Sequence, residues 1–171
     1  MDKTWYILFV MTGTEDKNCT FFNRNEMNCF VPKWEAVHKH QGQVEIVEKV
    51  MFPGYLFFQS DLTQLEFDSK IKQLRQQTKG VIKELKYKDD VTALTIEEQR
   101  NLEHMLNQEE VLTMSTGIIE NDRVIVLDGP LKGYESQIVH IDRHKRQATL
   151  QIDLCGRPTK VKASLEIIKK I

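Results

Sequence analysis

Residues 50–58 constrain the fold of this chain more than any other segment. They read VMFPGYLFF, so strand-favouring aliphatic and aromatic side chains surround a Pro53-Gly54 pair. Proline fixes φ and glycine adopts backbone conformations that other residues avoid, so the pair indicates a bend. Two interpretations stay open on this segment alone: a bent core strand, or an aromatic surface on which a partner docks.

The composition indicates a folded protein of one or two small domains. Hydrophobic residues make up 40% of the 171 residues and charged residues 29%, and no apolar run approaches the ~20 residues of a membrane helix. The first residues lack the basic and then apolar pattern of a signal peptide, so we expect a cytoplasmic protein. Cys19, Cys29 and Cys155 show no CxxC spacing, which favours buried or half-buried thiols over a disulfide framework or a zinc site.

Charge is distributed unevenly along the chain. Residues 1–117 carry 14 Lys/Arg and 18 Asp/Glu, whereas residues 118–171 carry 10 and 7. From Arg143 to the end, eight basic residues face two acidic ones. An acidic first part followed by a basic end indicates two modules with different partners.

The first part of the chain alternates strand and helix patterns, which predicts an α+β fold. The run from Trp5 to Val10 is almost wholly apolar and predicts a central strand buried on both faces. Thr95 and Glu98 have the spacing of a capping box, which predicts a helix start. Other expected elements are a helix from Glu15, a hairpin or mobile loop over 34–48, and a short strand over 81–85. The stripes of two further helices are Leu62, Leu65, Phe67 or Asp68, Ile71 and Leu74, then the mostly apolar Ile96, Gln99, Leu102, Met105 and Leu106.

Helical periodicity is lost over residues 107–116, and the pattern that follows is different. Short strands separated by dense turns recur at roughly ten-residue spacing, which predicts a small barrel. We therefore expect a domain over residues 1–110, a linker over 111–117 and a second domain over 118–171. The expected strands of the second domain cover residues 123–127, 137–141, 148–154 and 159–163.

Two motifs resemble those of a known family. Residues 119–134, IENDRVIVLDGPLKGY, closely resemble a KOW motif. Trp5-Tyr6, Gly13-x-Glu15 and Phe52-Pro53-Gly54-Tyr55 resemble the N-terminal domain of NusG, and their order fits nearly the whole chain. The resemblance implies an α/β sandwich domain followed by a five-stranded, SH3-like KOW β-barrel.

Two departures from the NusG pattern bear on function. Ser136 stands where the KOW motif usually has glycine, a position that serine tolerates when φ is negative. Lys160 and Lys162 make the end more basic than in housekeeping NusG, where this stretch contributes to a surface for a ribosomal protein. The chain is therefore most similar to the specialised NusG paralogues of the LoaP antiterminator group.

The resemblance implies a monomeric antitermination factor without a cofactor. Its N-terminal domain would dock on the clamp helices of the largest catalytic RNA polymerase subunit, bridge the cleft over the DNA and suppress pausing. The hairpin around residues 38–43 would face nucleic acid, such as non-template DNA, or the opposite side of the cleft. Its KOW domain would bind an RNA hairpin in a nascent leader transcript. The alternative is a general NusG that couples polymerase to the ribosome or to a termination factor.

The residues expected to carry these contacts fall into two sets. Phe57 is expected in the core, whereas Phe52 and Tyr55 are expected at the surface on either side of the bend. The polymerase-binding candidates are Trp5, Phe52, Pro53, Gly54 and Tyr55. The RNA-binding candidates are Lys132, Arg143, Lys145, Arg146, Arg157, Lys160 and Lys162.

Other classes of function find less support. The chain has no P-loop, GxSxG, HExxH or GxGxxG motif, so an enzyme is not expected. His38 and His40 have no third ligand nearby in sequence, and a solvated loop explains them better than a metal site. KOW barrels also occur in ribosomal proteins, but such a protein would not need the segment Phe52-Pro53-Gly54-Tyr55.

Overall fold

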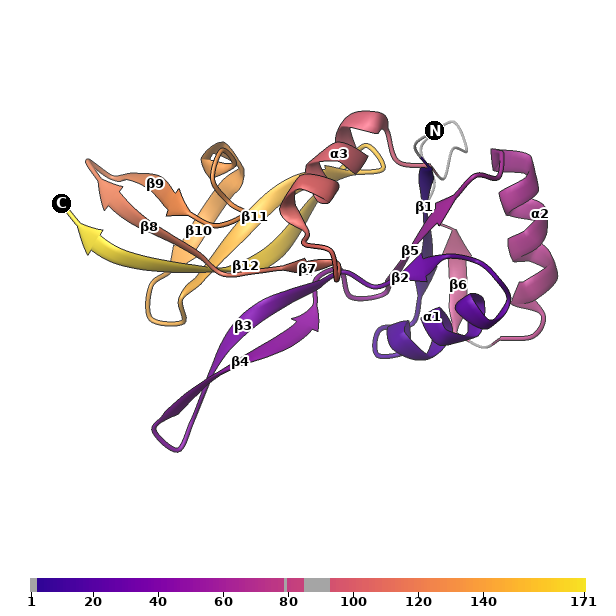
Figure 1. Cartoon of the computed structure of the whole chain (residues 1–171), viewed down its shortest axis with the longest axis horizontal. Coiled ribbons are helices and arrows are strands. Elements are labelled where there is room, and N and C mark those ends of the chain that lie inside the picture. Colours follow the sequence, from indigo (N-terminus) through magenta and orange to yellow (C-terminus); the bar gives the residue numbers. More distant parts are fainter. Residues whose placement is uncertain (1–2, 79, 85–92) are drawn as a thin grey trace. The chain divides into compact units, whose positions relative to one another are not determined.

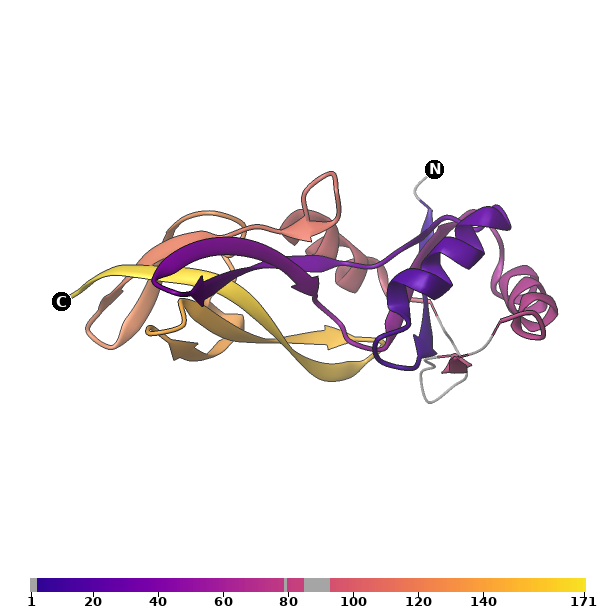
Figure 2. The same cartoon turned by 90° about the horizontal axis from the view of Figure 1, so that it is seen from below.

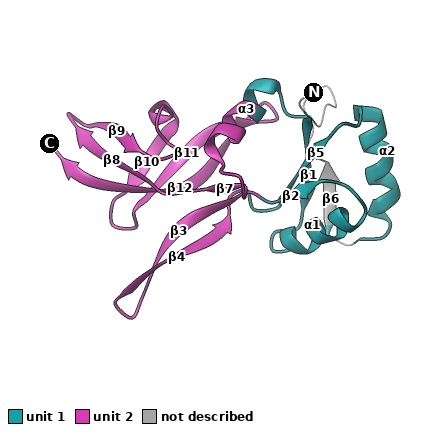
Figure 3. Cartoon of the chain, viewed as in Figure 1, with its two compact units in different colours: residues 1–31, 52–99 teal, residues 32–51, 100–171 magenta. Residues whose placement is uncertain are grey.

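The computed structural model describes residues 3–78, 80–84 and 93–171, and it divides into two compact units. Residues 1–31 and 52–99 form the first unit, and residues 32–51 and 100–171 form the second (Figure 3). The units therefore do not follow chain order, because residues 32–51 leave the first unit before the chain returns to it at residue 52.

The first unit is built on a four-stranded sheet of order β2-β5-β1-β6, in which every pairing is antiparallel (Figure 1). Its strands are β1 (Thr4–Val10), β2 (Cys29–Phe30), β5 (Tyr55–Ser60) and β6 (Val81–Glu84). Strand β1 lies between two partners and its apolar residues are largely buried, which confirms the predicted central strand. The predicted strand over 81–85 is confirmed as far as Glu84, and Leu85 lies outside the described residues.

Helices α1 (Glu15–Arg24) and α2 (Gln64–Arg75) pack on the same face of this sheet (Figure 2). Tyr6 and Phe58 are register partners on β1 and β5, so their side chains share one face. Phe22 of α1 packs edge-on against Phe58 with ring centroids 5.2 Å apart. Phe67 of α2 stacks on Tyr6 at 4.1 Å. These aromatic contacts bury the helices against the sheet.

Capping boxes define the starts of α2 and α3 (Ile96–Met105). The predicted box before α3 is confirmed, since the Glu98 amide donates to Thr95 Oγ1 at 3.1 Å and the Thr95 amide donates to Glu98 Oε1 at 3.0 Å. Two residues of the predicted apolar stripes point the other way: Leu65 is 80% exposed and Ile96 is 68% exposed. Leu65 is two residues from the buried Phe67, about 160° around the helix, so it must face solvent.

The second unit contains a five-stranded sheet of order β10-β11-β12-β8-β9 and a three-stranded sheet of order β4-β3-β7. All four predicted strands of the last third are confirmed, and η1 (Glu135–Gln137) precedes the second of them. Residues 34–48 form a hairpin rather than a loop. The strands are β3 (Lys33–His40), β4 (Gln43–Val50), β7 (Val111–Leu112), β8 (Ser115–Glu120), β9 (Arg123–Asp128), β10 (Ile138–Asp142), β11 (Gln147–Leu154) and β12 (Arg157–Lys170).

The stretch between the two predicted domains is itself ordered. β7 pairs in parallel with β3, and β8 pairs in parallel with β12. Ser136 lies in η1 with no positive φ, so serine fits this glycine position of the motif without strain. No helix within the described residues is long and apolar enough to cross a membrane.

Candidate functional site

The Phe52-Pro53-Gly54-Tyr55 segment forms a tight turn immediately before β5. The Tyr55 amide donates to the Phe52 carbonyl at 3.1 Å, and Gly54 has φ of 87°, the geometry in which glycine follows proline at the centre of a turn. A Cβ on Gly54 would lie 3.1 Å from the carbonyl oxygen of Val10. The turn therefore requires glycine both for its φ and for its close approach to β1.

A buried carboxylate holds this turn in place. Glu15, the first residue of α1, is 3% exposed. Its Oε2 accepts from the Gly54 amide at 2.8 Å, and its Oε1 accepts from the Gly13 amide at 2.7 Å. The Val10 amide also donates to the Gly54 carbonyl at 2.6 Å. The carboxylate thus joins the start of α1 to the turn in charge-assisted hydrogen bonds, and a backbone hydrogen bond joins the end of β1 to the same turn.

Aromatic rings form a continuous row across the sheet face opposite α1 and α2. Its consecutive centroid separations are Trp5–Phe30 5.0 Å, Phe30–Phe57 5.6 Å, Phe57–Phe52 5.1 Å, Phe52–Tyr55 6.1 Å and Tyr55–Phe9 5.1 Å. The row is buried from Trp5 to Phe52, and it becomes half-exposed at Tyr55 and Phe9. We call this set the aromatic row; its exposed end lies beside the turn.

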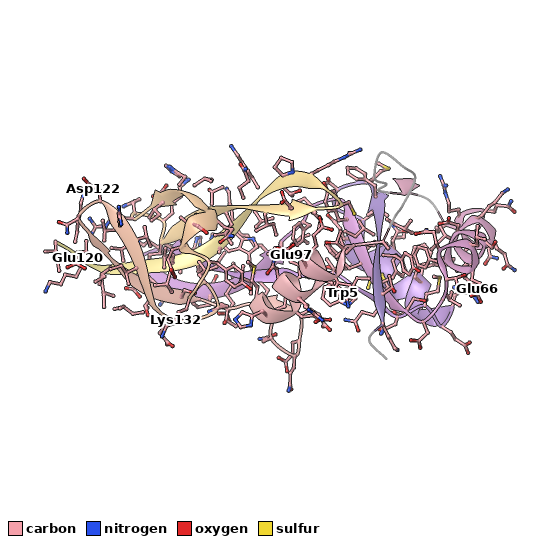
Figure 4. All side chains as sticks on the ribbon, turned by 90° about the horizontal axis from the view of Figure 1, so that it is seen from above. Trp5, Glu66, Glu97, Glu120, Asp122 and Lys132 are labelled. Carbon is pink, nitrogen blue, oxygen red and sulfur yellow. The ribbon has the colours of Figure 1, made fainter. Side chains whose placement is uncertain are left out.

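The predicted polymerase-binding residues differ in how far the structure exposes them. Phe57 is core, as expected. The expectation that Phe52 lies at the surface is wrong: it is 2% exposed because it packs between Tyr55 and Phe57. Trp5, which is labelled in Figure 4, is also buried, and its ring lies edge-on to that of Phe30. Pro53 is exposed, and Tyr55 is half-buried.

Three residues beside the turn were missed by sequence reasoning. Phe9 is half-exposed and touches Tyr55, Met11 is 55% exposed just after β1, and Glu15 anchors the turn. Alternation along β1 places Phe9 on the same face as Trp5, so Phe9 could have been found from the period of two. Nothing in the local pattern indicates the partners of Glu15.

The predicted RNA-binding residues lie in three places: strand β12, the β10–β11 turn and the turn after β9. Lys160 and Lys162 are exposed on one face of β12, where Lys162 is the register partner of Thr149 and Thr149 that of His140. Arg157 begins the same strand and is exposed. Arg143, Lys145 and Arg146 occupy the β10–β11 turn, at the other end of the β11–β12 pairing.

Lys132 is separate from these groups in the fold. It lies exposed in the turn after β9, one residue before Gly133 (Figure 4). Beside it Tyr134 places its ring 5.7 Å from that of His104 and donates to Asn101 Oδ1 at 3.5 Å, and burial raises the pKa of the Tyr134 hydroxyl. Lys132 is therefore isolated, and the β12 face with Lys160 and Lys162 and the β10–β11 turn are the two clusters among the predicted RNA-binding residues.

Two further surfaces carry charged, aromatic or apolar side chains that could contact nucleic acid or another protein. An open hollow on the first unit is lined by Lys17, Thr20, Phe21, Arg24, Gln77 and Thr78. On the β3–β4 hairpin, Val44 and Ile46 are about half exposed, and the rings of His38 and His40 stack at 6.2 Å. No three His, Cys, Asp or Glu side chains in the described part of the chain are arranged to hold a metal ion.

Comparisons with known proteins identify the family. A family model described as "Transcription termination factor nusG" matches residues 3–114, and a KOW motif model matches residues 120–153. These two models, in this order, place the chain among transcription factors. The chain belongs to the NusG family of transcription termination/antitermination factors.

Curated relatives match the chain over its whole length. It is similar to the transcription termination/antitermination proteins NusG of Thermus thermophilus (24% identical, 99% of this chain and 100% of that protein), Borreliella burgdorferi (23%, 100% of both) and Bacillus subtilis (23%, 100% of both). A solved structure described as "Domain interaction in Thermotoga maritima NusG" has a TM-score of 0.50 at 17% identity, with 95% of this chain and 93% of that chain covered. This structural likeness supports the NusG fold.

Proposed function

We propose that this chain is a specialised antitermination factor of the LoaP type, which binds RNA polymerase through residues 1–110 and an RNA hairpin through a KOW barrel over residues 118–171. In this proposal the sheet β10-β11-β12-β8-β9 closes into the barrel, residues 111–117 connect the domains, and the protein acts as a cytoplasmic monomer. It suppresses pausing and termination on long transcripts.

The exposed end of the aromatic row carries the polymerase-binding half of the proposal. Tyr55 offers a half-buried aromatic side chain at a hydrogen-bonded turn, and Pro53, Phe9 and Met11 supply further exposed or half-exposed apolar surface. Hot spots are typically aromatic residues in rigid surroundings, because little side-chain entropy is lost when they bind. Trp5, Phe52 and Gly54 take supporting roles beneath this surface, and the clamp helices of the largest catalytic subunit are the proposed partner.

The Lys160–Lys162 face carries the RNA-binding half. Alternate residues of a strand share one face, so both ammonium groups project from the same side of β12. Arg157 at the start of the strand and the basic β10–β11 turn extend the charge in both directions. A groove or backbone surface of a structured RNA hairpin fits such a face better than stacked single-stranded bases, because the predicted RNA-binding set contains no aromatic residue.

Non-template DNA is the third proposed partner, and the hollow on the first unit supports it. Lys17 and Arg24 supply positive charge for phosphates, and Phe21 between them supplies an aromatic surface for an unpaired base. The histidine stack at the end of the β3–β4 hairpin remains a second proposed contact.

Binding to an isolated clamp-helix fragment of RNA polymerase tests the first half. We expect Tyr55→Ala to weaken binding at least about tenfold, a loss typical of an interface aromatic. Leu65→Ala is the matched control, because Leu65 is an exposed apolar residue on α2, on the other face of the sheet. Equal affinity of Tyr55→Ala and Leu65→Ala would remove the basis for docking at the turn.

Hairpin affinity measured against salt concentration tests the second half. Lys160→Ala with Lys162→Ala should weaken binding and reduce the salt slope by about one per lost phosphate contact. Lys169→Ala with Lys170→Ala removes the same charge from the end of β12 and serves as control. If the wild type binds unrelated RNAs equally and weakly but binds a ribosomal protein or a termination factor, the general NusG alternative is favoured instead.

A further inference from the structure

Two cysteines that lie ten positions apart in sequence are brought together in the first unit. Cys19 is half-exposed on α1, and Cys29 is 5% exposed on β2. Asn23 connects them: its Nδ2 contacts Cys19 Sγ at 3.5 Å and donates to the Cys29 carbonyl at 3.0 Å. The Cys29 amide in turn donates to Asn23 Oδ1 at 2.7 Å. The end of α1 and the start of β2 are therefore held against each other by one side chain.

Asn23 thus brings Cys19 next to Cys29, and the thiol of Cys19 acts on that of Cys29. Burial raises the pKa of the Cys29 thiol well above its usual value, and a hydrogen bond with Cys19 raises it further. Cys29 is thus a buried, protonated thiol at neutral pH, whereas Cys19 is the member of the pair that solvent reaches. An accessible thiol next to a resolving thiol is the arrangement found in reversible redox sites.

We propose that Cys19 and Cys29 are a redox modification site, at which peroxide converts the two thiols into a reversible disulfide between α1 and β2. The Cys19 sulfur attacks one peroxide oxygen, the O–O bond breaks, and the other oxygen leaves as water, so that Cys19 becomes a sulfenic acid. The Cys29 sulfur then attacks Cys19, the S–O bond breaks, and the hydroxyl leaves as water with the Cys29 proton. The two sulfurs together lose two electrons, which reduce one peroxide to two waters.

The position of the disulfide gives it a structural consequence. β2 pairs with β5 through Cys29 and Phe58, and the next residue, Phe30, lies in the aromatic row between Trp5 and Phe57. A covalent bond from α1 to β2 closes a short loop and restrains the strand that supports this row. Oxidation should therefore stabilise the first unit, and reduction should reverse the effect.

The site can be mapped on the whole protein with trypsin. Reduced protein is exposed to hydrogen peroxide, alkylated, digested and analysed by mass spectrometry without reductant. Cleavage after Lys17, Arg24 and Lys33 places the two cysteines in peptides 18–24 and 25–33. We expect these two peptides to be joined by a disulfide, with a mass about two hydrogens below the sum of their separate masses. Dithiothreitol should separate them again. Cys155 is 1% exposed, so we expect peroxide to leave it unoxidised. Its thiol should then be alkylated once the protein is unfolded.

Variants distinguish this disulfide from other oxidation products. Cys29→Ser should leave a sulfenic acid on Cys19 that dimedone traps, and Cys155→Ser should retain the 18–24 to 25–33 link. The thermal midpoint of the oxidised wild type should lie several degrees above that of the reduced wild type. The oxidised and reduced forms of Cys155→Ser should differ in the same way. Sulfinic acid on Cys19 without a link to Cys29 in the wild type, or dimers joined through Cys19, would overturn the proposal.

Discussion

The Glu15 carboxylate accepts a hydrogen bond from the backbone amide of Gly54 at 2.8 Å, across 39 positions of sequence. The same carboxylate accepts from Gly13 at 2.7 Å. One side chain thereby fixes the angle at which α1 leaves β1 and the position of the turn that presents Tyr55. The surface proposed for polymerase binding depends on this buried carboxylate as much as on its aromatic side chains.

Glu15→Gln should lower the free energy of unfolding by about 2 kcal/mol, because an amide cannot accept from both backbone donors and carries no charge. Urea unfolding followed by circular dichroism measures the change. Glu97→Gln makes the same substitution at an exposed position in the first turn of α3 and should cost less than about 0.5 kcal/mol. Equal losses for the two variants would contradict the proposed role of Glu15.

Gly54→Ala should destabilise the protein for two reasons that a control separates. A left-handed φ costs a non-glycine residue about 1–2 kcal/mol, and at Gly54 the new Cβ would also lie 3.1 Å from the Val10 carbonyl oxygen. Gly42→Ala has a similar φ, +78°, with nothing within 4 Å of the Cβ. Unfolding measurements should show a larger loss for Gly54→Ala; an equal loss would mean that β1 moves away to accommodate the methyl group.

Gly129→Ala should be the most damaging glycine substitution in the KOW module. A Cβ there would lie 2.6 Å from Ser115 Cα and 2.8 Å from the Met114 carbonyl oxygen, at a φ of +106°. We expect a loss of about 3–5 kcal/mol from overpacking and strain together. Gly133→Ala, with φ of +92° and no atom within 4 Å, should cost only the strain. Thermal unfolding of the two variants compares them directly.

Tyr6→Phe should remove both a hydrogen bond and a pH dependence. The Tyr6 hydroxyl donates to the Leu62 carbonyl at 2.7 Å, a bond that contributes about 1 kcal/mol. Burial, followed by the charges of Asp68 and Glu66, raises the pKa of Tyr6 above 10.0. Because the folded pKa is the higher one, this contribution is present below about pH 10 and is lost as pH rises through the folded pKa. Unfolding free energies between about pH 8 and pH 11 should fall less steeply in Tyr6→Phe than in the wild type.

Local patterns in the sequence predict much of the fold. The apolar run of β1, the Thr95 capping box and the strands of the KOW module all follow from contacts between near neighbours in the chain or from a period of two. The ordered pairing of residues 111–120 could not be found in this way, because β7 pairs with β3 and β8 with β12, both far away in sequence.

The candidate site was predictable only in part for the same reason. The residue types of Pro53 and Gly54 predict the turn, and Tyr55, which follows it, is half-buried in the structure. The burial of Phe52 depends on ring contacts across the turn, which its position beside the Pro53-Gly54 bend does not reveal. Glu15 and the Cys19–Cys29 pair depend on how α1 packs against its surroundings, which no short motif encodes.

The composition of the second unit has a consequence for synthesis of the protein. The Ser164 hydroxyl of β12 donates to the Glu35 carbonyl of β3, so this unit joins residues that are 129 positions apart. At the usual rate of translation, Glu35 is added to the growing chain on the order of 10 s before Ser164. Throughout that interval the β3–β4 hairpin has been made while its partner strand has not. The nascent chain should therefore pass through a stage in which Trp34 and Ala36, both buried in the finished protein, are open to water and to chaperones.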